Sequence, residues 1–133
     1  MSLTGGCYCG ALRYEVTGDP MFQGQCHCRE CQYISGGSPN VLMGFPEANF
    51  KYTQGEPKAF RRKDLESPVT REFCPECGTH IVSKPTGMPA AIIKVGTLDE
   101  PSQFTPQMAI QLLDKQSFHH VPDGVKTFDR MPG

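Results

Sequence analysis

The sequence predicts a mainly β domain built from short antiparallel strands. Apolar and polar side chains alternate with a period of two over several segments, which is typical of half-buried strands. The segments between them are rich in turn-forming residues, with 14 Gly and 12 Pro among 133 residues. A chain of this length buries one modest core. We therefore expect a single domain over residues 1–133 in which short strands are separated by many turns.

The strands can be assigned in order along the chain. In the segment 12–16, Leu12, Tyr14 and Val16 alternate with charged residues, and Gly-Asp-Pro at 18–20 ends the run as a turn. Similar short segments, each bounded by Gly, Pro, Ser or Asn, predict strands at 40–45, 50–53, 58–62, 69–73, 80–84 and 92–95. The segment 108–115 fits a helix or a strand equally well, and the sequence leaves that choice open.

Charge and hydropathy argue against nucleic-acid and membrane partners. The net charge is −1, which does not supply the basic surface that binding to a phosphate backbone requires. The longest apolar runs are as short as residues 90–93, whereas a bilayer-spanning helix needs about 20 residues. The first residues show neither the positive start nor the apolar run of a secretory signal. We therefore expect a cytoplasmic protein.

All seven cysteines lie in three tight clusters: Cys7 and Cys9; Cys26, Cys28 and Cys31; Cys74 and Cys77. An odd number leaves one thiol unpaired, and disulfides are rare in a reducing compartment, so metal binding is favoured over disulfides. The sequence Cys74-Pro-Glu-Cys77-Gly78 has the form of a zinc knuckle. Its two sulfurs can converge on one ion, and the glycine can adopt the left-handed conformation that closes the turn.

The simplest division of the thiols is four plus three. The two outer pairs would form one closed structural site, made of Cys7, Cys9, Cys74 and Cys77. The remaining three cysteines would form a second group with one open position, which is the pattern of a reactive zinc site. A single zinc site with spare thiols or another ligand set also fits the spacing. An iron–sulfur cluster fits less well, because the longer four-cysteine runs of ferredoxins are absent.

Four motifs follow one another along the chain: Gly6-Cys7-x-Cys9-Gly10, Cys26-His27-Cys28-x-x-Cys31, Arg71-x-Phe73-Cys74-x-x-Cys77-Gly78 and Val95-Gly96-Thr97-Leu98-Asp99. In this order they resemble the glutathione-dependent formaldehyde-activating enzyme family, whose domain also occurs in centromere protein V. The similarity runs over about residues 5–101, and the C-terminal remainder is expected to complete the fold.

The resemblance implies a fold, two metal sites and a reaction. The implied fold is a β-tent of antiparallel sheets stapled by zinc, with structural ligands at Cys7, Cys9, Cys74 and Cys77. A second zinc is implied at Cys26, Cys28 and Cys31, where glutathione would bind through its sulfur. The implied reaction is of the carbon–sulfur lyase type, in which a glutathione-like thiol is added to, or released from, a small carbonyl compound such as formaldehyde.

Other polar residues have more limited roles. Arg29 lies inside the second cluster and is the cation best placed to meet a carboxylate of a glutathione-like ligand. His27 lies between two predicted ligands and is expected to point away from the metal. His119 and His120 are expected on the solvated surface. The general acid or base and the oligomeric state are not predicted.

Two further classes of function are considered. A non-catalytic zinc-stabilised binding module, or a thiol carrier, would use the same cysteines without chemistry. A zinc-containing methionine sulfoxide reductase on a similar fold would need a nucleophilic cysteine late in the chain. No cysteine follows Cys77, so the sequence disfavours that class.

Overall fold

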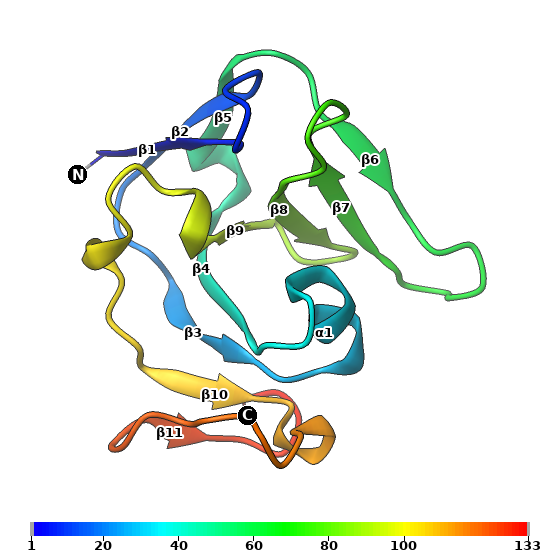
Figure 1. The fold of residues 1–133 in the computed structure, drawn as a ribbon, viewed down its shortest axis with the longest axis vertical. Helices are drawn as coiled ribbons and strands as arrows, with labels where there is room; N and C mark the ends of the chain where they lie inside the picture. The colour runs from blue at the N-terminus through cyan, green and yellow to red at the C-terminus, as the bar shows by residue number, and fades with distance from the viewer. Residues whose placement is uncertain (1, 133) are drawn as a thin grey trace.

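The computed structural model describes residues 2–132, which form two β-sheets (Figure 1). The smaller sheet is antiparallel, with the strand order β1-β2-β5. Its strands are β1 (Ser2–Gly6), β2 (Arg13–Thr17) and β5 (Phe50–Gln54). The alternation that predicts a strand at 12–16 is visible in β2, where Tyr14 and Val16 are buried and their neighbours are not.

The larger sheet has eight strands in the order β11-β10-β3-β4-β9-β8-β7-β6. The strand β10 pairs in parallel with both β3 and β11, and the remaining pairs are antiparallel. The strands are β3 (Phe22–Cys26), β4 (Asn40–Pro46), β6 (Lys58–Phe60), β7 (Val69–Phe73), β8 (His80–Pro85), β9 (Ala90–Lys94), β10 (Met108–Ile110) and β11 (Lys126–Thr127).

One short α-helix and four 3-10 turns complete the fold of residues 2–132. The helix α1 (Arg29–Ser35) begins after Cys28, whose sulfur accepts a hydrogen bond from the Cys31 backbone amide. It ends at Gly36, whose φ of 80° allows its own amide to bond back to Gln32. The 3-10 turns are Glu47–Asn49, Val95–Thr97, Pro101–Gln103 and Leu112–Asp114. No helix of residues 2–132 is long and apolar enough to cross a membrane.

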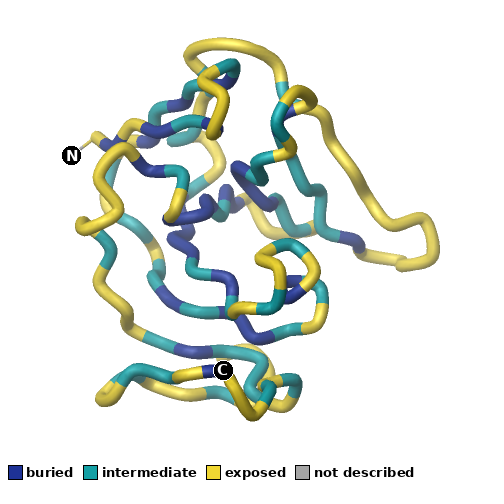
Figure 2. The backbone as a smooth tube through the Cα atoms, viewed as in Figure 1, coloured by how far each residue is buried: buried dark blue, intermediate teal, exposed yellow. Residues whose placement is uncertain are grey.

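The main core lies between the two sheets, where the buried segments gather at the centre of the molecule (Figure 2). Tyr14 of the smaller sheet stacks on Phe50 with ring centroids 5.2 Å apart, and its hydroxyl pairs with Thr97 at 2.7 Å. From the larger sheet, Phe45 and Ile81 are fully buried in the same cluster. Burial of such side chains stabilises a domain by about 1.5–3 kcal/mol each.

The mainly β class predicted from the sequence is confirmed, and each predicted strand corresponds to an observed one. The strand predicted at 58–62 is shorter, because β6 ends at Phe60. The undecided segment 108–115 begins as strand β10 and continues into a 3-10 turn. The strands β1, β3 and β11 and the helix α1 were not predicted. The first three lack a clear alternation of apolar residues, and α1 spans only seven residues.

Candidate metal centre

Two turns bring the outer cysteine pairs together. Cys7 and Cys9 lie in the turn between β1 and β2, and Cys74 and Cys77 lie in the turn between β7 and β8. Each turn is closed by a residue with positive φ, which is Gly10 in the first turn and Gly78 in the second. These four residues, Cys7, Cys9, Cys74 and Cys77, are called the four-cysteine group below.

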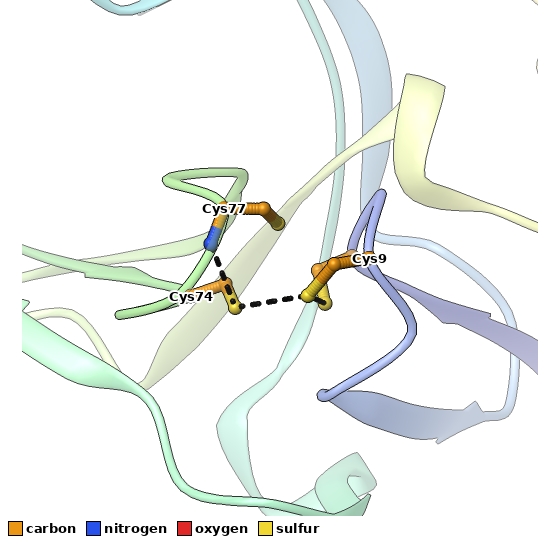
Figure 3. Close-up of side chains that lie close together, drawn as sticks. Cys9, Cys74 and Cys77 are labelled. Carbon is orange, nitrogen blue, oxygen red and sulfur yellow. Dashed lines mark hydrogen bonds between the residues drawn. The ribbon is translucent and has the colours of Figure 1, made fainter.

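The four sulfurs form a cluster compact enough to surround one metal ion. They all lie within 4.8 Å of one another. The Cys7 and Cys9 sulfurs are 3.6 Å apart, and those of Cys9 and Cys74 are 3.7 Å apart. In Figure 3, Cys9, Cys74 and Cys77 point toward one another from the two turns. A tetrahedron with metal–sulfur bonds of about 2.3 Å has edges of about 3.8 Å, so the spacing fits zinc, whereas a disulfide needs about 2.05 Å.

Backbone amides and one hydroxyl are aimed at these sulfurs. The amide of Leu12 donates to the Cys7 sulfur at 3.2 Å, and that of Cys77 donates to the Cys74 sulfur at 3.5 Å. Hydrogen bonds from the hydroxyl and backbone of Thr79 lower the pKa of the Cys77 thiol to about 5. The same hydroxyl accepts a hydrogen bond from the Tyr8 amide at 3.1 Å. Thr79 therefore joins the two turns and favours the thiolate form.

The other three cysteines converge at the start of α1. Cys26 ends β3, Cys28 caps the helix and Cys31 lies in its first turn. Their sulfurs also lie within 4.8 Å of one another. The side-chain amide of Asn40 donates to the Cys31 sulfur at 3.6 Å. This set, Cys26, Cys28 and Cys31, is called the three-cysteine group. Three soft donors suit zinc and leave one position for another ligand.

The imidazole of His27 is turned toward the C-terminal segment. Its Nδ1 lies 3.2 Å from Nδ1 of His119, and its Nε2 lies 3.1 Å from the Gln25 side-chain oxygen. The His119 Nε2 in turn donates to the Gly37 carbonyl at 2.6 Å. The expectation that His119 is solvated is wrong, because only 7% of it is exposed. His119 is buried because its ring lies against the buried ring of His27, which is distant in the sequence. His120 is exposed, as expected.

A cavity of about 590 Å³ opens over the three-cysteine group. We call it the thiol cavity. Its polar lining consists of Lys94, Ser83, Arg71, Glu30 and Gln111 beside the three cysteines. The rest of the wall is mainly aliphatic, aromatic and methionine side chains. The volume lies within the range of about 300–1,000 Å³ that is usual for small-molecule sites.

The family profile described as glutathione-dependent formaldehyde-activating enzyme matches residues 2–114 of the chain. The chain belongs to this family. The matched region contains both cysteine groups and extends beyond the similarity expected at about residues 5–101, since it includes β1 and β10. The membership inferred from the motifs is therefore confirmed.

Two individual proteins show how far the similarity to known members and structures extends. A relative from Halomonas elongata, assigned by name to the glutathione-dependent formaldehyde-activating enzymes, is 29% identical over 84 residues, covering 59% of this chain. This match takes in 54% of the relative, so the chain spans about half the length of that protein. A crystal structure of a Rhodobacter sphaeroides protein superposes with a TM-score of 0.60 at 14% identity, covering 95% of this chain and 99% of the other. At this low identity, the similarity shows a shared fold alone.

One cation that lines the thiol cavity beside the three-cysteine group is Lys94, at the end of β9. Lys94 interacts with these thiols through its charge. It is 8% exposed, and its ammonium donates to the Ser83 hydroxyl at 2.6 Å. Burial lowers the pKa of Lys94 to about 8, and the negative charge of Cys31 opposes that shift. Hydrogen bonds from Cys26 and Cys28, with further contributions from Asn40 and Lys94, lower the pKa of Cys31 to about 3. The surroundings therefore stabilise a thiolate in this group.

Arg71 and Lys94 are cations of the thiol cavity that the sequence analysis did not single out. Arg71 precedes the Cys74 knuckle by three residues, and Lys94 ends an otherwise apolar strand, which is an unusual place for a lysine. The predicted cation, Arg29, lies on the exposed side of α1 and does not line the thiol cavity. It lines a neighbouring cavity instead, and its role as a ligand-binding residue stays a prediction.

Proposed function

We propose that this protein is a zinc-dependent enzyme of the carbon–sulfur lyase type, which joins or separates a glutathione-like thiol and a small carbonyl compound such as formaldehyde. The observation that carries the proposal is the three-cysteine group at the wall of the thiol cavity, beside the buried ammonium of Lys94. Membership of the family supports the choice of thiol and carbonyl compound.

The donor sets support two zinc ions with different tasks. The four-cysteine group offers a closed set that joins the two sheets, as a structural site does. The three-cysteine group offers three sulfur donors and opens to a cavity. A zinc ion held there would lower the pKa of a ligand thiol and keep its thiolate at neutral pH.

The side chains of the cavity would then hold and orient the reactants. The sulfur of the thiol forms a bond to the carbonyl carbon, the π electrons of the carbonyl move to its oxygen, and the thiol proton ends on that oxygen. The reverse step releases the same two compounds, and no oxidant is needed. With zinc held by the three cysteines and the substrate thiol, the charge of Lys94 would offset part of the net negative charge, and the apolar wall would limit access of water to the reacting carbon.

A cytoplasmic location is part of the proposal. All seven cysteines are free thiols in residues 2–132, and a reducing compartment keeps thiols available for metal and ligand.

The reaction is tested by the rate at which glutathione and ¹³C-formaldehyde exchange with their adduct, measured by NMR exchange spectroscopy. The zinc-loaded protein should accelerate this exchange over the uncatalysed reaction. The Cys28→Ser variant should not, although it is expected to stay folded. An exchange rate that the wild-type protein leaves unchanged would contradict catalysis.

A thiol carrier or zinc-stabilised binding module is the second candidate. Three thiolates give the zinc site a net negative charge, which makes the metal a weaker Lewis acid than three neutral histidines would. Binding of glutathione without any acceleration of exchange would favour this candidate.

A further inference from the structure

A second cavity adjoins the thiol cavity on the other side of α1. It has a volume of about 430 Å³ and is bounded by α1, by the segment 60–68, which is exposed up to residue 67, and by β7 and β8. We call it the arginine cavity, because Arg29, Arg62 and Arg71 line it. Neither cysteine group contributes to its lining.

The lining of the arginine cavity carries more positive than negative charge. Its one acidic side chain is Glu30, which accepts a hydrogen bond from Arg71 at 2.8 Å and lies 3.8 Å from Arg62. Arg62 also pairs with Asp64 at 2.6 Å. Arg29 forms no ion pair with any acid in residues 2–132. Its guanidinium donates to the neutral Gln32 side chain. One guanidinium is therefore available for an anion.

Two ring side chains support a binding role for this cavity. The guanidinium of Arg29 lies over the ring of Tyr33, 5.1 Å from the centroid, which restrains its orientation. The Nδ1 atom of His80 is buried and has no hydrogen-bond partner among residues 2–132. A buried polar atom without a partner is costly. His80 is therefore a residue of the cavity wall whose hydrogen-bonding capacity no group in residues 2–132 satisfies.

The two cavities share a wall, and the shared residues lie beside the three-cysteine group. Glu30, Val69 and Arg71 line both cavities. Glu30 immediately precedes Cys31 in α1. The side chain of Arg71 is only 11% exposed. The two cavities are therefore neighbours, with the Arg71–Glu30 ion pair between the three-cysteine group and the side chains of Arg29 and Arg62.

We propose that the arginine cavity binds the carboxylate end of the thiol substrate, so that the enzyme selects extended thiols with an anionic tail over small neutral ones. This inference rests on the proposed function, because it takes the thiol to bind at the three-cysteine group. Guanidinium groups bind carboxylates in a bidentate manner, and this geometry gives directional selectivity. Arg29 is then the specificity-determining residue, and Arg62, which pairs with Asp64, adds positive charge to the same cavity.

The test compares two thiols by isothermal titration calorimetry on the zinc-loaded protein. Glutathione carries carboxylates, and 2-mercaptoethanol carries none. The variants are Arg29→Gln, Arg62→Gln and the double variant, with Arg61→Gln as the matched control. Arg61 is exposed, bonds to Thr86 and lines neither cavity. Because all three arginines are exposed, the variants should keep the fold, which thermal melts and zinc content verify.

Loss of a charge-assisted hydrogen bond costs about 1.5–3 kcal/mol, so Arg29→Gln should weaken glutathione binding by about tenfold or more. Arg62→Gln should weaken it less, because that guanidinium already pairs with Asp64. The affinity for 2-mercaptoethanol should not change, and Arg61→Gln should behave as wild type with both thiols. The inference is overturned if the double variant binds glutathione as tightly as the wild type, or if it loses both thiols equally. Failure of the wild-type protein to bind either thiol would instead refute the proposed function itself.

Discussion

Replacing one cysteine in each group should separate stability from ligand binding. Cys77→Ser removes a proposed zinc ligand that is only partly buried, so the substitution leaves no large cavity in the core, and we expect its effect to come from loss of the metal. Cys28→Ser removes a ligand from the three-cysteine group. Serine is a favoured residue at the N-terminal cap of a helix, so the start of α1, now capped by the Cys28 sulfur, should be preserved.

The difference in stability follows from the length of chain that each site closes. Cys9 and Cys74 are 65 residues apart, and restricting a loop of that size in the unfolded chain stabilises the fold by about 4 kcal/mol in the chain-entropy treatment of cross-links. From Cys26 to Cys31 the loop has only about six residues, which gives about 2 kcal/mol. The first site also joins the two sheets, whereas the second is local to β3 and α1.

A loss of about 4 kcal/mol corresponds to a fall of roughly 12–20 °C in the unfolding midpoint for a domain of this size. The total binding energy of a structural zinc, on the order of 10 kcal/mol, is comparable to the net stability of a domain. Cys77→Ser should therefore be insoluble or molten, and Cys28→Ser should stay folded with one zinc and no affinity for glutathione. Circular dichroism melts, metal analysis and calorimetry measure these properties. A Cys28→Ser protein that collapses like Cys77→Ser would refute the division into structural and reactive sites.

Three other predictions use the same protein. Graded chelation should strip the three-cysteine group first, because it has one fewer protein ligand and an open position; metal analysis that shows both ions leaving in one step would count against this. His119→Ala should lower the free energy of unfolding by about 1–3 kcal/mol, because it leaves the Gly37 carbonyl and Nδ1 of the buried His27 without their partner; urea denaturation that shows no change would argue that the pair contributes nothing. Lys94→Met should weaken glutathione and 2-mercaptoethanol alike, on the order of tenfold, since both bring a thiolate to the buried ammonium; calorimetry that shows an effect on glutathione alone would place Lys94 with the tail of the substrate instead.

The sequence contains enough local information to predict the strands and the two cysteine groups. The alternation around Tyr14 specifies which face of β2 is buried, and the Cys-x-x-Cys-Gly pattern at Cys74 specifies a turn whatever surrounds it. The simplest division of the seven cysteines, four plus three, already places the two outer cysteine pairs in one group. The structure brings the sulfurs of each group within 4.8 Å of one another.

The surroundings of the site depend on contacts that local patterns do not report. His119 is buried because residues 92 positions apart place its ring against His27. Arg71 and Lys94 belong to the thiol cavity because β7, β8 and β9 lie side by side in the sheet. Arg29 is near the cysteines in sequence, but the turn of α1 directs it to the neighbouring cavity. Local sequence patterns therefore predicted the two cysteine groups better than the residues around them.

The most direct measurement for the proposed site is a crystal structure of the zinc-loaded protein with glutathione, in which anomalous scattering at the zinc edge locates the metal ions. The account predicts two zinc peaks, one in each cysteine group, and a glutathione sulfur about 2.3 Å from the zinc of the three-cysteine group. A single peak in the four-cysteine group, with glutathione bound elsewhere or absent, would contradict it.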